Sequence, residues 1–534
     1  MLSLIPQTAA LSTAATVTIP MLICFFGLMI AVGISCRKHS TNVDDFVLGG
    51  RAVGPWLTAF AFGTSYFSAV IFVGYAGQFG WNFGLASTWI GLGNAFIGSL
   101  LAWMVLGRRT RIMTQHLGSK TMPDFFEKRY DSKQLKVIAS FIVFVFLIPY
   151  TASLYNGLSS LFNNIFSIPY WVIVLVMAVL TGVYVIFGGY MATAINDFIQ
   201  GIIMLVGIVA VIAAVLGQNG GLSAAVEALN VSEHAGPQFT SAFGPNPIFL
   251  LFVVLLTSLG TWGLPQMVGK FYSIKDDAAI KKGTLISTVF AVVVAGGCYF
   301  LGGFGKLYFD DMQAAGHISP TGAVLFDKVI PTMLRNLSPV VVALIVVLVL
   351  AASMSTLSSL VLTSSSTLTL DVVTPLVEKK AKMDDKKNVL IMRLFIVFFI
   401  AVSAVIAILK DSIWADSVFI AQMMGVSWGA LAGAFLAPFL YGLYWKKVTK
   451  AAVAVNFAFG TALEIVQLCI SVGWLSVTDV PVLNFVFTNS LYSGVFAMVG
   501  GLVLVPIVSL LTPKTLPDKV DEKFACYNKT AATL

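Results

Sequence analysis

Long apolar runs, separated by short segments that carry the charges, make up most of the chain. Each run is long enough for a helix of about 20 residues to cross a lipid bilayer, with some allowance for tilt. We predict thirteen membrane-spanning helices, at residues 17–36, 56–79, 86–107, 135–163, 168–187, 192–216, 247–272, 284–305, 339–373, 390–409, 413–444, 451–475 and 484–511. The pattern therefore indicates an all-α integral membrane protein.

Composition supports this class and excludes others. Of the 534 residues, 58% are hydrophobic and 10% are charged, whereas a soluble domain has about 25% charged residues. The five cysteines are scattered, without the spacing of a disulfide framework or a metal site. We therefore expect neither a soluble or disordered chain nor zinc or redox chemistry.

The positions of the basic residues predict the orientation. No basic residue precedes the first run, and Arg37 and Lys38 follow it, which favours a retained span with its amino terminus outside. This choice places 28 of the 32 Lys and Arg residues on the cytoplasmic side. The net charge of +8 thus reflects topology and contact with anionic lipid, not a nucleic-acid partner. We expect a multi-pass protein of the plasma (inner) membrane with a cytoplasmic carboxyl terminus.

Two spans carry helix-breaking residues in mid-membrane. The second contains Gly63-Thr64-Ser65, and the seventh contains Gly260 to Pro265. Small residues also permit close helix packing, but a pair of interrupted helices five spans apart is typical of the opening helices of two inverted repeats in a transporter. The expected parts are an extra helix and linker (1–55), a first repeat (56–216), an external loop (217–246), a second repeat (247–444), two further helices (445–512) and a cytoplasmic tail (513–534).

Polar groups within the spans are the candidates for binding. In the ninth span, Ala352, Ser355, Thr356 and Ser359 lie on one helical face. Hydroxyl and carbonyl oxygens are suitable ligands for an alkali cation, although serine and threonine also join membrane helices by hydrogen bonds. Carboxylates inside the apolar zone are functional candidates by default. Asp197 is one such candidate, whereas for Glu464 we favour a local hydrogen-bonding or oligomer-contact role.

Four stretches resemble one known family, the sodium/solute symporters: Phe187–Gln200, Pro265–Phe271, Ala351–Ser359 and Tyr441–Lys447. The resemblance covers roughly residues 20–512. It implies a leucine-transporter-like 5+5 inverted repeat with broken first helices. It also implies Na⁺ coupling, with the ligands of sodium site 1 drawn from Thr64, Phe67, Ala352, Ser355 and Thr356, and those of sodium site 2 from Asp197, Ser355, Ser358 and Ser359.

The substrate is predicted by comparison within that family. The stretch Gly260 to Pro265 looks most like the monocarboxylate and pantothenate branch, although Gln266 and Lys270 replace the usual His and Arg. Sugar, sialic-acid and proline carriers have other residues at the aligned positions. We therefore expect a small organic anion of the monocarboxylate type, with a proline-like amino acid or a sugar as the alternative. The expected substrate residues are Ser65, Ser68, Ile71, Tyr150, Ser153, Thr257, Thr261, Trp262 and Gln422.

Other classes of function fit the sequence less well. A membrane sensor with a transporter fold would carry an output domain, and the polar tail is short. A channel would show charged rings or a filter sequence, and an enzyme would show a nucleophile and its base. The expectation is a sodium-coupled importer that works by alternating access, with a small-molecule solute, sodium ions and membrane lipid as partners, as a monomer or weak homo-oligomer.

Overall fold

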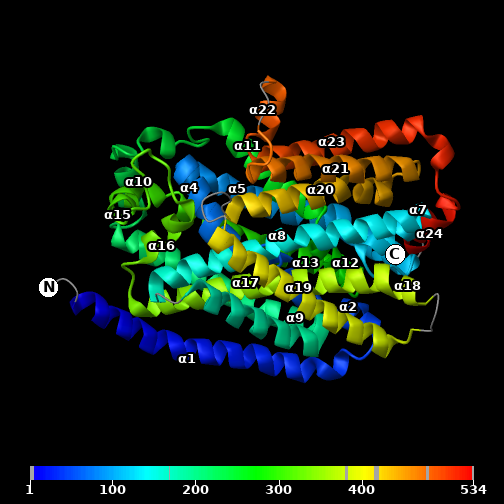
Figure 1. Cartoon of the computed structure of the whole chain (residues 1–534), viewed down its shortest axis with the longest axis horizontal. Helices are drawn as coiled ribbons and strands as arrows, with labels where there is room; N and C mark the ends of the chain where they lie inside the picture. The colour runs from blue at the N-terminus through cyan, green and yellow to red at the C-terminus, as the bar shows by residue number, and fades with distance from the viewer. Residues whose placement is uncertain (1–4, 167–168, 379–382, 414–419, 477–479, 532–534) are drawn as a thin grey trace.

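The computed structural model describes residues 5–166, 169–378, 383–413, 420–476 and 480–531, and these residues form helices and loops without a β-strand. The long helices run roughly along one axis of the molecule (Figure 1). Within the described part of the chain, ten helices are long and apolar enough to cross a membrane, or eleven if one bent pair counts as a span. The all-helical membrane fold predicted from the apolar runs is confirmed.

The helices of the first half, up to the loop near residue 240, are α1 (Ile5–Ser35), α2 (Val43–Leu48), α3 (Pro55–Thr64), α4 (Ala76–Phe83), α5 (Thr88–Gly93), α6 (Arg108–His116), α7 (Met122–Tyr130), α8 (Lys133–Phe166), α9 (Tyr170–Gln218) and α10 (Leu222–Val231). The second half contains α11 (Pro247–Leu259), α12 (Pro265–Ser273), α13 (Asp277–Ala291), α14 (Gly297–Gly302), α15 (Phe309–Ala314), α16 (Val329–Leu334), α17 (Pro339–Thr367), α18 (Thr374–Val377), α19 (Asp385–Ile413), α20 (Ile420–Tyr444), α21 (Lys450–Ser471), α22 (Pro481–Phe487), α23 (Ser490–Leu511) and α24 (Val520–Ala531). Short π or 3₁₀ turns join some of them, among which η3 (Val70–Tyr75), η5 (Asn94–Leu101), η8 (Gly260–Trp262) and η12 (Leu368–Val373) matter below.

The predicted spans and the helices differ mainly in how they are joined. The spans predicted at 168–187 and 192–216 lie within the single helix run α9, where Gly189 has a φ of 55° and ψ of −147° and separates two helical parts. The spans predicted at 56–79 and 86–107 overlap one apolar run, Val70–His116. Residues 414–419 of the span predicted at 413–444 lie outside the described residues. The count of thirteen therefore stays a prediction.

The central helix is α17. From Ile345 to Leu362 every side chain is buried, whether apolar or hydroxyl. A helix that is apolar all round is expected to be surrounded by other helices, and α17 contacts α1, α8, α9 and α19. The hydroxyl run predicted to bind a cation therefore lies in the interior of the bundle.

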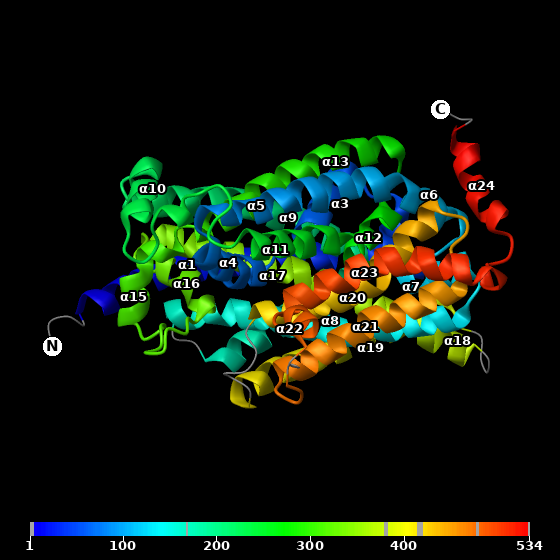
Figure 2. The ribbon, with the colours of Figure 1, turned by 90° about the horizontal axis from the view of Figure 1, so that it is seen from above.

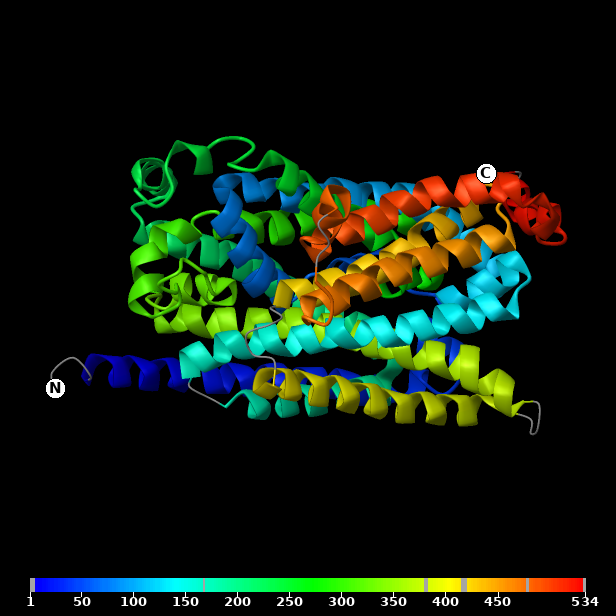
Figure 3. The same ribbon diagram turned by 45° about the horizontal axis from the view of Figure 1, so that its top comes forward.

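Opposite ends of the molecule carry different elements. The start of α1 shares one end with α10, α15 and α16, whereas α7, α18 and α24 lie at the other end, which we call the C-terminal end (Figures 1 and 2). Turning the molecule by 45° leaves the same two groups at the two ends (Figure 3).

At the C-terminal end, a charged network joins three segments. The Lys136 ammonium on α8 lies 3.1 Å from an Asp124 oxygen on α7 and 3.5 Å from an Asp371 oxygen on η12. Lys136 also contacts Glu127 at 2.9 Å, and the Thr121 hydroxyl donates a hydrogen bond to Asp371 at 2.6 Å. The network fixes α7 across the ends of two bundle helices.

Candidate sodium and substrate site

The second predicted span is interrupted where the sequence places Thr64 to Ser68. Helix α3 ends at Thr64, and regular structure resumes at Ala69. The Ile71 amide bonds to the Ser68 carbonyl, so the Phe67 carbonyl is available to another partner. Free backbone carbonyls at membrane depth are tolerated only where protein or a water-filled space supplies partners. Here the partners come from α17.

The structure brings together all five residues predicted for sodium site 1. The Thr356 hydroxyl lies 3.0 Å from the Thr64 carbonyl, 3.3 Å from the Phe67 carbonyl and 3.1 Å from the Ala352 carbonyl. The Ser355 hydroxyl lies 3.2 Å from the Thr64 carbonyl and 3.1 Å from the Ala352 carbonyl. All five residues are buried. Five uncharged oxygens thus converge between a broken helix and the central helix, a donor set suited to a hard monovalent cation.

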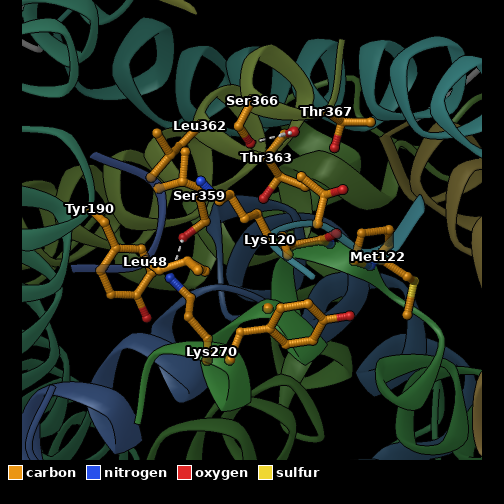
Figure 4. Close-up of a pocket in the computed structure, with 16 residues that line it drawn as sticks. Leu48, Lys120, Met122, Tyr190, Lys270, Ser359, Leu362, Thr363, Ser366 and Thr367 are labelled. Atoms are coloured by element: carbon orange, nitrogen blue, oxygen red, sulfur yellow. Dashed lines mark hydrogen bonds between the residues drawn. The ribbon is translucent and has the colours of Figure 1, made fainter. Parts of the chain in front are cut away.

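The residues predicted for sodium site 2 have a different environment. Asp197 on α9 is fully buried, and one of its carboxylate oxygens lies 3.7 Å from the ammonium of Lys270 on α12. The same ammonium donates a hydrogen bond of 3.1 Å to the Ser359 hydroxyl, as Figure 4 shows. Ser358 bonds instead to the Ser355 carbonyl of its own helix, at 2.9 Å. The Lys270 ammonium therefore contacts Asp197 and Ser359, two of the four residues predicted to bind the second sodium ion.

Lys270 itself was not predicted as a site residue. It is one of the 28 basic residues predicted on the cytoplasmic side, whereas its side chain is 5% exposed and lies within the bundle. Lys270 lies on α12, the second part of a span that bends by 41° between Trp262 and Pro265. The sequence feature that could have identified Lys270 as a site residue is its position in the second half of an interrupted apolar span, where a charged residue is a functional candidate.

The predicted substrate residues fall into several groups. Ser65 is connected to Lys270 through Ser359, because the Ser65 hydroxyl lies 2.8 Å from the Ser359 hydroxyl that accepts the hydrogen bond of the ammonium. The Thr261 hydroxyl and the Trp262 indole donate to backbone carbonyls of η5, at 3.1 and 3.0 Å. The hydroxyls of Thr257 and Ser153 bond to carbonyls of their own helices. Ile71 is buried with its carbonyl facing Cys298, and the Gln422 side-chain oxygen has no partner among the described residues.

A buried aromatic cluster lies between the two broken segments. The Trp428 ring of α20 is 6.4 Å from the Tyr66 ring and 6.1 Å from the Tyr150 ring, centroid to centroid. A side chain at Gly260, in the second break, would come within 3.5 Å of the Trp428 ring. Trp428 therefore touches α8 and both interrupted helices at once.

This cluster presents polar atoms without partners. The Tyr150 hydroxyl faces Ser68 and Trp428. Yet the hydroxyls of Tyr66, Ser68 and Tyr150 and the Trp428 indole nitrogen make no hydrogen bond of normal geometry within the described part of the chain. Buried polar groups are normally hydrogen-bonded, so four unpaired ones within a single cluster make it a candidate binding site. Sequence reasoning found Ser68 and Tyr150 but missed Tyr66 and Trp428, which only the tertiary fold brings near them.

Glu464 lies where α21 packs against α20. It is fully buried on α21, and a side chain at Gly429 of α20 would come within 2.4 Å of its carboxyl oxygen. The Ser493 hydroxyl of α23 lies beside its carboxyl group, although neither carboxyl oxygen makes a hydrogen bond of normal geometry with the described residues. The role predicted for it, a local or oligomer contact, stays a prediction.

Comparison with solved structures gives the fold class. The chain superposes on an outward-open, sodium-coupled sialic acid symporter with a TM-score of 0.75 at 18% identity, covering 93% of this chain and 97% of the other. A manganese transporter of Eremococcus coleocola gives a TM-score of 0.50 at 13% identity, covering 86% and 95%. The fold is therefore that of secondary transporters with broken helices, as the resemblance implied.

Sequence comparison gives the family. The profile described as "Sodium:solute symporter family" matches residues 46–456, and the chain belongs to this family. A sodium/proline symporter of Staphylococcus aureus is 29% identical over 503 residues, which are 92% of each chain. Family membership makes sodium the coupling ion of a multi-pass symporter.

Proposed function

We propose that this protein imports a small zwitterionic amino acid of the proline type together with sodium. The curated relatives named sodium/proline symporter support this substrate class, which the sequence analysis held as the alternative to a monocarboxylate. Their match extends over 92% of both chains, so it includes both broken helices. The expectation of a monocarboxylate rested on the stretch Gly260 to Pro265.

The orphan polar atoms around Trp428 are the observation that carries the proposal. Three aromatic rings can cover the apolar ring or side chain of a small amino acid. The hydroxyls of Ser68 and Tyr150 and the indole N–H can bind a carboxylate, and the freed backbone carbonyls of the break can bind an ammonium group. No arginine or lysine contributes to this described cluster, which suits a substrate without net charge.

Sodium binding at the predicted site 1 would couple to this substrate site through the break in the second span. Thr64 and Phe67 supply carbonyls to the ion, and Tyr66 and Ser68 face the substrate, so the single segment 64–68 responds to both ligands. An ion that orders the break raises the affinity for the substrate, and the effect is reciprocal. Asp197, Ser355, Ser358 and Ser359 form a second cation site in this proposal, holding either sodium or a protein ammonium.

The finer cellular assignments also belong to the proposal. We place the protein in the plasma (inner) membrane with α10, α15 and α16 outside and α7, α18 and α24 in the cytoplasm. The positions of the basic residues support this orientation. The repeat boundaries at 56–216 and 247–444 and the monomeric or weakly oligomeric state are proposed on the same sequence grounds.

A thermal-unfolding screen of the purified protein tests the substrate class. Binding to the folded state raises the unfolding midpoint. The proposal expects proline or a similar amino acid to raise the midpoint in sodium but much less in choline. Short monocarboxylates and hexoses serve as competitors. If a monocarboxylate raises the midpoint and every amino acid fails, the substrate is the anion and the amino-acid proposal is wrong.

A further inference from the structure

Lys270 is a buried cation at the place where the sequence predicts a second sodium ion. Its ammonium contacts Ser359 at 3.1 Å and Asp197 at 3.7 Å, two members of the predicted second ligand set. It also lies 5.3 Å from the centre of the Tyr190 ring. Both charged side chains are nearly or fully buried.

Electrostatics favours one cation here. A buried carboxylate without a counter-charge is strongly unfavourable in a low-dielectric interior. The ammonium neutralises Asp197 with the same unit charge that a sodium ion would bring. A second monovalent cation beside Lys270 would leave the pair with a net positive charge and would displace the ammonium from its hydrogen-bond acceptor.

The ammonium is also connected to sodium site 1. The Ser359 hydroxyl that accepts its hydrogen bond lies 2.8 Å from the Ser65 hydroxyl. Ser65 follows Thr64, whose carbonyl is a predicted ligand of the first ion. A tethered cation can therefore hold the break in place permanently, as a bound second ion would do only when present.

A small cavity of about 50 Å³ lies beside the lysine (Figure 4). Lys120, Thr121 and Met122 line it at α7, and Lys270 and Ser359 line it within the bundle. This volume exceeds the roughly 30 Å³ that one water occupies in the liquid. A free cation could reach Asp197 by this route once the lysine side chain was shortened.

We propose that the ammonium of Lys270 replaces the second sodium ion, so that the wild-type protein binds and transports one sodium per substrate. Removing the lysine charge converts the position into a working sodium site formed by Asp197 and Ser359. The inference rests on the proposed sodium-coupled import and adds its stoichiometry.

The test counts sodium ions. Binding of ²²Na⁺ to purified protein and dual-isotope uptake of ²²Na⁺ and ¹⁴C-proline in proteoliposomes should give one sodium for the wild type, with a Hill coefficient near one. Lys270→Met and Lys270→Gln should give two, with a Hill coefficient approaching two. Lys270→Arg, which keeps the charge, and the double variant Asp197→Asn/Lys270→Met should both return the count to one.

Two results would overturn the inference: two sodium ions in the wild type, or one sodium in a folded Lys270→Met or Lys270→Gln protein. If neither neutral variant folds, the wild-type count decides alone, with one supporting the inference and two refuting it. The ²²Na⁺ binding arm needs no proline. Sodium binding without proline uptake would therefore count against the proposed substrate and leave the inference standing.

Discussion

At the scale of single residues, Thr356 contacts more members of the proposed sodium site than any other predicted ligand. Its hydroxyl contacts the carbonyls of Thr64, Phe67 and Ala352, whereas the Ser355 hydroxyl contacts two of these. Because all are uncharged, each oxygen supplies a substantial part of the ion's coordination. Loss of one should therefore be visible in sodium affinity without loss of the fold.

Thr356→Ala and Ser355→Ala should each raise the half-saturating sodium concentration. A hydrogen-bonding group that contacts a charge contributes about 1.5–3 kcal/mol, which corresponds to roughly tenfold to hundredfold in affinity. The larger effect is expected for Thr356. The measurement is the sodium dependence of uptake in proteoliposomes. Ser365→Ala is the matched control, because that buried hydroxyl of α17 bonds only to Val361 and Leu362 of its own helix. Unchanged sodium dependence in both site variants would refute the assignment.

Trp428→Phe and Tyr150→Phe should weaken substrate binding while keeping the aromatic packing. Tyr150→Phe removes only the hydroxyl, so the apparent substrate affinity should fall by several-fold to about tenfold, as expected for a loss of about 1 kcal/mol per hydrogen bond. Trp428→Phe removes the indole N–H together with part of the buried ring, so its effect should be at least as large. Substrate concentration series at saturating sodium give the measurement. Tyr441→Phe, on α20 like Trp428, is the control, since its hydroxyl donates a hydrogen bond to the Leu502 carbonyl. Substrate affinities equal to those of the wild type in both variants would show that the substrate binds at another place.

One part of the candidate site can be recognised from sequence more readily than the other, for a physical reason. Ser355 and Thr356 share a helical face, and spacing along a helix is fixed by its geometry. Lys270 and Trp428 reach the site only through a bend between helices and the packing of α20 against α8 and the second break. No local periodicity contains that information. Thr261 and Trp262, although correctly assigned to a break, hydrogen-bond to η5.

At the scale of elements, the broken helices decide the geometry. Hydroxyls, glycines and a proline marked the breaks near Ser65 and Leu264, and the structure has both. The third interruption, at Gly189 in α9, sits where the prediction placed a turn between two spans. Gly189 has positive φ, and an added side chain would lie 2.9 Å from the Phe46 ring and 3.0 Å from the Phe46 carbonyl.

Gly189→Ala should therefore destabilise the protein by about 1–3 kcal/mol, the range for a residue held in a strained backbone conformation. The thermal-unfolding midpoint in detergent should fall. Gly217→Ala in the same helix is the control, because a side chain there meets nothing within 4 Å, and its midpoint should stay level or rise slightly. Equal midpoints for the two variants would contradict the strain argument.

The network at α7 predicts a pH dependence. Burial alone would raise the pKa of Asp124, but the ammonium groups of Lys136 and Lys128 hold this pKa below its usual value. A lowered folded-state pKa gives stability that is present above the unfolded pKa and lost as pH falls through the folded pKa. Wild type should therefore be more stable than Asp124→Asn at neutral pH, and the difference in unfolding midpoint should shrink in acid. A difference that is constant with pH would show that Asp124 acts by packing alone.

At the scale of the whole molecule, α1 begins at one end of the bundle and α24 lies at the other (Figure 1). Together with the basic residues, this predicts an external amino terminus and a cytoplasmic carboxyl terminus. A carboxyl-terminal fluorescent-protein fusion should fluoresce, and a periplasmic phosphatase fused there should be inactive. An active phosphatase would show that the carboxyl terminus lies outside and would contradict the predicted orientation.

The central claim is that a sodium gradient drives import of a proline-type amino acid. Each charge that moves across 100 mV supplies about 2.3 kcal/mol, enough for roughly fiftyfold accumulation. The most direct measurement is uptake of ¹⁴C-proline into proteoliposomes that contain only this protein, with an inward sodium gradient and a potential set by potassium and valinomycin. The account predicts accumulation above equilibrium that requires sodium and disappears when choline replaces it. Equal uptake in choline, or sodium-driven accumulation of a monocarboxylate with none of any amino acid, would contradict it.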